Sequence, residues 1–404
     1  MDGKKTGNMS VKAEEPHIIL TLADLGSPSR PRSGARAHAS RRRRGDAPLR
    51  LRLQVKPLSA KDREALENSR GFVAAARAMP LSLIEPVART RVAPGTTPAT
   101  GWGIVAVSAD GSPFDGTDVV VAVLDTGIDE THAAFHGVKL VRKNFTDDVD
   151  NDTVGHGTHC AATIFGRDVA GTRIGIARGV KKALIGKVLG PDGGSTDAMA
   201  AALQWAVDNG AHVVSMSLGI DFPGMVQELT ERGMPVARAT SAALSAFRDT
   251  VRLFDRLAEY MRAGASLRDT GALVVAASGN ESQRPRFTID CSPPANTDGF
   301  ISVAAVGPGP KFAVASFSNT RAQVAAPGVD IVSAAAGGKL VAMSGTSMAT
   351  PHVAGVAALW AQRSIQGGHF DASELHARVL ASAQRPHGAR FEDVGAGMVR
   401  APLD

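Results

Sequence analysis

Short apolar segments alternate with helix-length segments along the chain from about residue 102 onward. Five of the apolar segments are rich in small and β-branched residues, and they cover residues 119–124, 183–189, 212–216, 273–277 and 301–306. Such runs are typical of strands that are buried on both faces, and their alternation with helices indicates β-α-β units. The pattern predicts an α/β fold with a mostly parallel central sheet and helices on both faces.

Residues 237–263 form a long amphipathic segment. Arginine and glutamate follow one side of it, and the other side carries apolar residues at helical spacing: Leu244, Phe247, Val251, Phe254, Leu257 and Met261. This period predicts a helix that packs on the sheet. A helix that docks a partner is the alternative.

The first 101 residues differ in composition from the rest. Residues 1–48 are polar and basic, and the stretch from 30 to 56 contains nine arginines and one lysine but only one acid, Asp46. We expect residues 1–48 to be a disordered arm and do not expect nucleic-acid binding, because no aromatic or amphipathic pattern accompanies the charge. Residues 49–101 contain a strand–helix–strand pattern at 51–55, 60–78 and 81–84, followed by a linker.

Composition limits the classes to which this chain of 404 residues can belong. The net charge is +6, but the excess lies in the basic arm and therefore says little about partners. Two cysteines, Cys160 and Cys291, are too few for a disulfide scaffold. No apolar run reaches the roughly 18 residues of a membrane helix, and no secretory signal is visible. We expect a monomer without membrane contact that is cytoplasmic by default, or secreted if the start residue is misassigned.

Asp125 ends the first apolar run, in Val-Leu-Asp-Thr-Gly. A carboxylate there lies at the carboxyl end of a buried strand, where α/β proteins bind their ligands, and it needs a hydrogen-bond partner. Asp-Thr-Gly is also the signature of aspartic proteases. Those enzymes need two such loops or a small all-β homodimer, so one copy in a long α/β chain leaves this alternative weak.

His156 lies between two glycines in Gly-His-Gly-Thr-His-Cys, at the start of an expected helix. A neutral imidazole at this place can accept a proton from a hydroxyl group. His159 would allow a metal pair with His156, but no third ligand is apparent, and we expect no catalytic metal. Cys160 shares a helical face with His156, which leaves a Cys–His nucleophilic pair as an alternative to a buried structural thiol.

Ser347 lies in Gly-Thr-Ser-Met-Ala-Thr-Pro-His, directly before a nearly uncharged segment at 348–360 that is typical of a buried helix. The N–H groups and the dipole at the N-terminus of such a helix favour an anion. Serine alone at this place would be a helix cap. Asn280 follows the apolar run 273–277, and its amide group can donate a second hydrogen bond to an oxyanion.

These three motifs, in the order Asp125, His156 and Ser347, resemble those of the subtilisin-like (subtilase) family over about residues 102–401. Cys160 directly after the histidine motif resembles the proteinase-K-like branch. The resemblance implies a three-layer subtilisin-like fold and a serine endopeptidase that cleaves polypeptides through an acyl-enzyme on Ser347. It implies that Asn280 completes the oxyanion hole and that the chemistry requires no cofactor.

The resemblance also implies a cleft that holds an extended peptide by strand addition. Six residues are expected to line it: Ser217, Leu218, Gly219, Gly190, Gly193 and Gly279. Residues 102–404 would form the peptidase domain, with residues 220–271 as a helical insertion longer than in compact members of the family. Residues 49–101 are compatible with a prosegment-like unit or a linker.

Asp148, Asp150 and Asp152 have the spacing of the first ligands of an EF-hand calcium loop. Thr153 occupies the position where that loop needs glycine, and His159 the position where it needs glutamate. The sequence is therefore compatible with a structural calcium ion but does not indicate one.

Overall fold

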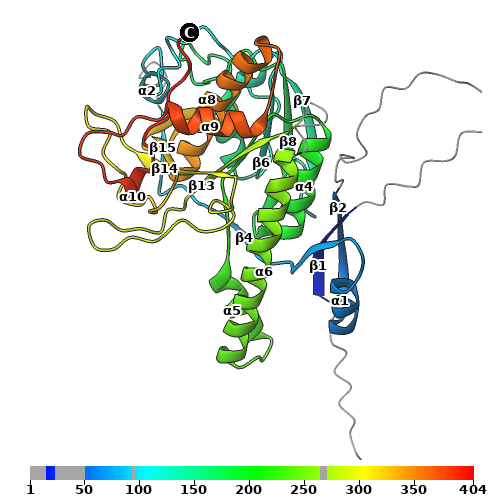
Figure 1. The fold of residues 1–404 in the computed structure, drawn as a ribbon. Helices are drawn as coiled ribbons and strands as arrows, with labels where there is room; N and C mark the ends of the chain where they lie inside the picture. The colour runs from blue at the N-terminus through cyan, green and yellow to red at the C-terminus, as the bar shows by residue number, and fades with distance from the viewer. Residues whose placement is uncertain (1–14, 23–50, 93–96, 264–270) are drawn as a thin grey trace, which may run out of the picture.

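The computed structural model describes residues 15–22, 51–92, 97–263 and 271–404, and its largest part is a seven-stranded sheet (Figure 1). The strand order is β15-β14-β13-β11-β6-β8-β7, and all neighbours are parallel. The strands are β6 (Val120–Asp125), β7 (Lys139–Asn144), β8 (Lys182–Lys187), β11 (Val213–Met216), β13 (Leu273–Ala277), β14 (Ile301–Val306) and β15 (Val324–Pro327).

Both faces of this sheet are buried. In β6, Val121 and Val123 belong to the apolar core on one face, and Ala122 and Leu124 to the core on the other, because side chains alternate across a strand. The first core includes α3 (His156–Phe165), α8 (Thr346–Gln366) and α9 (Ala372–Ser382), and the second includes α4 (Thr196–Asp208), α5 (Phe222–Glu231) and α6 (Val236–Ala263). The predicted three-layer α/β fold is confirmed.

Smaller elements surround the central sheet. Two further sheets have the strand orders β12-β4-β10-β9 and β16-β17-β5. Their strands are β4 (Pro80–Leu83), β5 (Ala88–Arg91), β9 (Leu189–Gly190), β10 (Gly193–Ser195), β12 (Leu218–Ile220), β16 (Ile331–Ala335) and β17 (Lys339–Ser344). The short helices are α2 (Trp102–Ala106), η1 (Ala133–Phe135) and α10 (Phe391–Val394).

An antiparallel sheet with the order β2-β1-β3 precedes these elements in the chain. It consists of β1 (Glu15–Leu22), β2 (Leu51–Leu58) and β3 (Phe72–Arg77), with the helix α1 (Ala60–Glu67) between β2 and β3. The prediction of a disordered arm over residues 1–48 is wrong for residues 15–22, which form the central strand. The arginine cluster of that arm lies outside the described residues.

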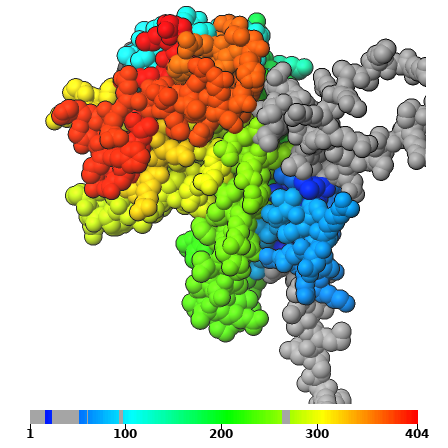
Figure 2. All heavy atoms as spheres, in the orientation of Figure 1, coloured from blue at the N-terminus to red at the C-terminus, as the bar shows by residue number. Residues whose placement is uncertain are grey.

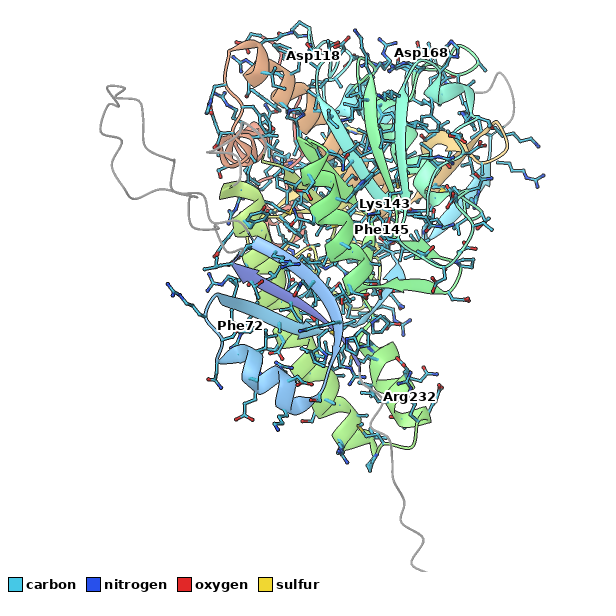
Figure 3. All side chains as sticks on the ribbon, turned by 90° about the vertical axis from the view of Figure 1, so that its right-hand side faces the viewer. Phe72, Asp118, Lys143, Phe145, Asp168 and Arg232 are labelled. Atoms are coloured by element: carbon cyan, nitrogen blue, oxygen red, sulfur yellow. The ribbon has the colours of Figure 1, made fainter. Side chains whose placement is uncertain are left out.

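This N-terminal unit lies against α6 and α4 (Figures 1 and 2). Ile18 and Leu20 of β1 are fully buried in the same apolar core as Phe254 and Leu257 of α6. Figure 3 shows the unit from its outer side, with Phe72 on β3 and Arg232 at the far end of the α5–α6 hairpin. The long helix of the insertion therefore packs on the sheet on one side and docks the start of its own chain on the other.

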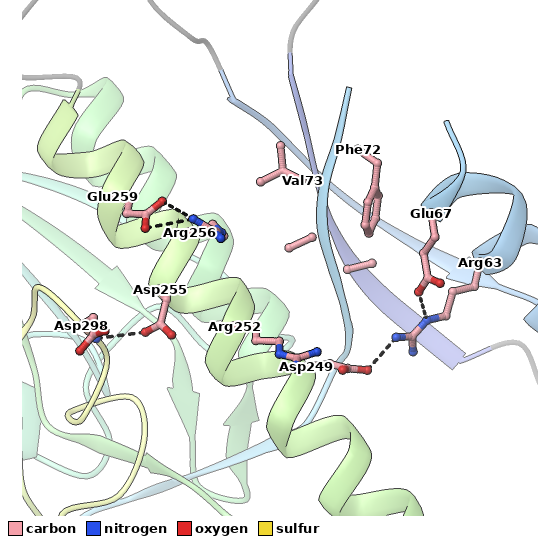
Figure 4. A pocket seen from close by; sticks show the side chains of 12 residues that line it. Arg63, Glu67, Phe72, Val73, Asp249, Arg252, Asp255, Arg256, Glu259 and Asp298 are labelled. Carbon is pink, nitrogen blue, oxygen red and sulfur yellow. Dashed lines mark hydrogen bonds and ion pairs between the residues drawn. The ribbon is translucent and has the colours of Figure 1, made fainter. Parts of the chain in front are cut away.

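An ion pair joins the N-terminal unit to α6. The guanidinium group of Arg63 on α1 lies 2.6 Å from the carboxylate of Asp249 on α6 and 2.8 Å from Glu67 (Figure 4). Asp249 is only 7% exposed, so this contact is shielded from water on the helix side. Leu244, which the sequence pattern predicted to belong to the apolar stripe of this helix, is 58% exposed.

Among the described residues, no helix combines the length and the apolar character needed to span a membrane.

Candidate active site

Asp125 and His156 meet at the carboxyl end of the central sheet. Asp125 is the last residue of β6, and His156 is the first residue of α3 after Gly155, whose positive φ of 82° suits glycine. Nδ1 of His156 donates a hydrogen bond to Oδ1 of Asp125 over 2.7 Å, and the N–H of Thr126 donates to the same oxygen. Both side chains are nearly inaccessible to water. The carboxylate therefore fixes the orientation of the imidazole ring.

The charge state of His156 depends on this contact. Burial by itself lowers the pKa of His156, but the negative charge of Asp125, together with Cys160, outweighs burial and raises the pKa well above its ordinary value near 6.5. The other ring nitrogen, Nε2, is buried and has no hydrogen-bond partner among the described residues. In the neutral form of the ring, with the proton on Nδ1, Nε2 is therefore the atom that can accept a proton.

Ser347 is the second residue of α8, where backbone N–H groups have no acceptor within the helix. Its hydroxyl group donates a 2.8 Å hydrogen bond to the carbonyl oxygen of Ile84 and forms no hydrogen bond with Nε2 of His156. Pro351 cannot donate to the carbonyl oxygen of Ser347, as another residue four positions on would do. That oxygen accepts instead from Sγ of Cys160 at 3.3 Å and Oγ of Ser217 at 3.4 Å.

Asn280 lies beside the start of α8. Its Oδ1 accepts hydrogen bonds of 2.9 Å from both the N–H and the hydroxyl group of Thr346, which fixes the orientation of the amide. Its Nδ2 donates over 2.8 Å to the carbonyl oxygen of Glu85, the residue after Ile84. A Cβ atom on Gly345 would lie 3.0 Å from this Nδ2 atom, so glycine leaves the amide room.

The strand β4 leads directly to Ile84, the residue that Ser347 contacts. It pairs antiparallel with β12 on one side and with β10 on the other, so that it completes a sheet between two edges of the main body. The N–H of Ile84 continues this ladder to the carbonyl oxygen of Ser217 over 3.4 Å. Ile84 is 5% exposed, and Leu81, three residues before it, is 2% exposed. The chain's own segment is thus bound as an extended peptide.

The chain continues past Ser347 along a further edge. After Glu85 and Pro86, β5 pairs antiparallel with β17, and the N–H of Val87 donates to the carbonyl oxygen of Ser344. Backbone pairing therefore holds the chain on both sides of Ser347.

The predicted substrate-binding residues do not all touch β4. Leu218 pairs with Leu83 and Gly219 with Ser82, and Cβ on Gly219 would lie 3.7 Å from the Ile84 side chain. Gly193 passes so close to β4 that its Cβ would lie 2.5 Å from the Leu81 carbonyl oxygen. Two of the predicted residues do not pair with β4. Gly190 lies in β9, which pairs with β10, and the N–H of Gly279 donates to the hydroxyl group of Thr346.

The structure gives little support to a metal pair of His156 with His159 or to a nucleophilic pair of Cys160 with His156. Nε2 of His159 donates to the carbonyl oxygen of Ile331, and burial lowers the pKa of His159 to about 3. Sγ of Cys160 lies 3.8 Å from Nδ1 of His156, the nitrogen that Asp125 already binds, and burial raises the pKa of this thiol. Asp125, His156 and Cys160 are the one group close enough to hold a metal ion among the described residues. Two of these three groups are already bound to each other.

The three aspartates with EF-hand spacing have protein partners. Asp148 pairs with Nζ of Lys187 at 2.8 Å, and Asp150 accepts from Asn144 at 3.1 Å. Asp152 is 6% exposed and accepts from Thr126 of the Asp125 loop and from the first turn of α3. A calcium ion would have to displace these donors. Asp152 instead links the loop that carries Asp125 to the helix that carries His156.

Sequence reasoning missed several residues that complete the site. Ile84 was assigned only to a strand, although it lies against Ser347. Thr346 stands next to Ser347 in the quoted serine motif, and its polar side chain was the signal that could have found it. Asp152 was considered only as a calcium ligand, although it lies four residues before His156.

The sequence of this chain is also similar to those of known proteins. The sequence pattern of the subtilase family matches residues 116–397. Subtilisin-like protease 6 of Trichophyton equinum is 32% identical over 297 residues, which is 70% of this chain and 64% of that protein. Subtilisin-like protease 1 of the same fungus is 34% identical over 288 residues, 66% of this chain and 48% of the relative.

The chain thus spans less than two thirds of the length of these relatives. Their names give no compartment, so the expectation of a cytoplasmic location gains no support from them. A family pattern that covers most of the chain and a fold that agrees with it nevertheless lead to a single assignment: the chain belongs to the subtilase family.

Proposed function

We propose that this protein is a serine endopeptidase whose own residues 79–84 occupy its substrate cleft before activation. The observation that carries the proposal is the contact of Ser347 Oγ with the carbonyl oxygen of Ile84, beside a hydrogen-bonded Asp125–His156 pair. In this reading, Ile84 is P1, the residue before the scissile bond, and Glu85 is the first residue after it. The substrates are polypeptides, and no cofactor takes part.

The proposed chemistry uses Oγ of Ser347 and Nε2 of His156. Oγ of Ser347 turns from the Ile84 carbonyl oxygen to the carbonyl carbon, and Nε2 of His156 accepts its proton. Asp125 holds the ring and stabilises the imidazolium. When the C–N bond breaks, the imidazolium gives its proton to the new amino group of Glu85. Water, activated by His156, then hydrolyses the acyl-enzyme and releases Ser347.

Asn280 and the backbone N–H of Ser347 would stabilise the negative oxygen of the tetrahedral intermediate. The amide of Asn280 currently donates to Glu85, one carbonyl away from the required oxygen. The proposed reaction therefore includes a shift of this hydrogen bond from Glu85 to Ile84. The need for that shift, and the lack of a hydrogen bond between Ser347 and His156, are consistent with a resting precursor.

We expect Ile84→Asp to block self-processing in the full chain. A carboxylate at this position would be buried against Gly219 without a partner, which costs at least several kilocalories per mole. Intact-mass measurement over time should show wild-type chains that begin at Glu85, and variant chains that stay whole. A matched change at an exposed position, Val55→Asp, should leave processing unaltered. If the Ile84→Asp chain is cut after residue 84 at the wild-type rate, the assigned bond is wrong.

We expect Asn280→Ala to reduce kcat by roughly 10²–10³-fold and to leave KM nearly unchanged, because its amide contributes chiefly in the transition state. The magnitude is the one known for subtilisin, a member of the same family. Steady-state hydrolysis of a short peptide by the processed enzyme measures both constants. A change confined to KM would instead assign Asn280 to ground-state binding.

A further inference from the structure

The hydrogen bonds to the bound segment do not stop at P4, the position of Leu81. Two residues further from Ser347, the N–H of Met79 donates to Oγ1 of Thr196 over 2.9 Å, and the N–H of Thr196 donates back to the carbonyl oxygen of Met79 over 2.9 Å. Met79 stands at P6 in this numbering. The reciprocal pair therefore extends the β4–β10 ladder by one full residue.

A further hydrogen bond reaches the bound segment at P5, from the side of the cleft opposite to Thr196. The N–H of Asp221 donates to the carbonyl oxygen of Pro80 over 3.0 Å. Asp221 is the N-cap of α5, and its own side chain accepts from Gly224, so the insertion begins at this contact. α5 also lies against β4. The helical insertion thus lengthens the wall of the cleft on this side.

The backbone N–H groups of Thr196 and Asp221 have no hydrogen-bond acceptor within their own helices. Thr196 is the first residue of α4 and Asp221 precedes α5, and N–H groups at such places have no intrahelical acceptor. Thr196 is completely buried beneath β4, and Met79 is 1% exposed. A substrate peptide that replaced residues 79–84 would restore the hydrogen bonds of Thr196 and Asp221. A peptide that reached only to P4 would leave these groups without partners.

We propose that Asp221 forms an additional subsite S5 and Thr196 an additional subsite S6, and that the two select unfolded polypeptide segments with at least six residues before the scissile bond. This inference rests on the proposed peptidase function. The specificity-determining contacts are backbone contacts plus one hydroxyl group, so they select the length and extended form of the substrate rather than a particular side chain. Release of residues 15–84 frees both subsites.

The test compares two fluorogenic peptides on the self-processed protein. One carries Leu-Ser-Leu-Ile before the coumarin leaving group, and the other Met-Pro-Leu-Ser-Leu-Ile. Three additional hydrogen bonds should raise kcat/KM of the longer peptide about 10-fold or more over the shorter one. Equal values would overturn the inference and leave the peptidase function intact. Hydrolysis of neither peptide would overturn the function itself.

A second pair of measurements isolates the Thr196 hydroxyl group. In the N-acetylated long peptide, where the nitrogen of the P6 methionine is an amide as in the chain, N-methylation removes the donor and should lower kcat/KM about 3- to 10-fold. Thr196→Val removes the acceptor and should lower the ratio of kcat/KM for the long peptide to that for the short one by the same factor, with no further loss on the methylated peptide. Thr196→Ser should restore this ratio.

Thr230→Val is the matched control in α5, because the hydroxyl group of Thr230 binds Val226 within the helix; it should leave the ratio at its wild-type value. Additive effects of methylation and Thr196→Val would contradict the contact. If Thr196→Val does not fold, the methylated peptide on wild type decides.

Discussion

Replacing Ser347 by alanine should leave the full chain intact and abolish peptide hydrolysis. The change removes one oxygen from a completely buried side chain, so the fold has little to lose, whereas the proposed acyl-enzyme has no other atom on which to form. The expected loss in kcat is roughly 10⁶-fold, the magnitude known for the nucleophile of subtilisin. Intact-mass measurement and labelling with a fluorophosphonate probe are the two readouts.

Ser364→Ala is the matched control, because Ser364 lies in the same helix, α8, far from the cleft. It should be processed and labelled like wild type. Added wild-type enzyme should cut the Ser347→Ala chain at the same bond, which would show that the precursor is folded and that only its nucleophile is missing. Retained self-processing of Ser347→Ala in a preparation free of other proteases would disprove the assignment.

The central sheet was predictable where its strands are buried on both faces. β13 and β14 begin and end at the predicted residues, because an uninterrupted apolar run has few other interpretations. β7 was missed, since this edge strand reads Lys-Leu-Val-Arg-Lys-Asn and half of its side chains are charged. β15 was missed because it has only four residues and ends in proline. β1 was missed because its apolar residues lie within a polar, basic region.

The three sequence motifs could be recognised because each consists of a few consecutive residues. Asp125, His156 and Ser347 each lie within a short residue pattern typical of the subtilase family, and their order in the chain makes the combination more specific. The position of β4 between β10 and β12 could not be predicted in this way. β4 is four residues long, and the partners Met79 and Thr196 are 117 residues apart. Pairing at that distance depends on the folded sheet, not on any pattern within the segment itself.

Asp125→Asn should reduce kcat of the processed enzyme roughly 10⁴-fold, the magnitude known for this position in serine proteases, including subtilisin. An amide in place of the carboxylate can donate to Nδ1 of His156 and thereby favours the wrong tautomer, in which Nε2 carries the proton. The variant should still fold, because asparagine has the shape of aspartate. A rate within tenfold of wild type would show that Asp125 does not orient the base.

The same substitution should change the pH dependence in a defined direction. His156 must be neutral to act as a base, so wild-type kcat/KM should rise with pH through a pKa above 6.5, because Asp125 raises that pKa. In Asp125→Asn, burial is no longer opposed by the carboxylate, and the acid limb of the remaining activity should move to lower pH. The stability has the matching sign: the Asp125–imidazolium contribution is fully present below about 6.5 and is lost as the pH rises through the raised pKa.

NMR titration of histidine-labelled Ser347→Ala protein measures the pKa of His156 without self-cleavage, and the Asp125→Asn double variant provides the comparison. His352, which is buried and donates to Met348, lies outside the catalytic pair and serves as an internal reference, since burial lowers its pKa to about 4. The double variant should lower the pKa of His156 and leave that of His352 in place. A pKa of His156 that is the same in both proteins would show that Asp125 orients the ring without stabilising its charge, and the large loss of rate would then be due to the tautomer alone.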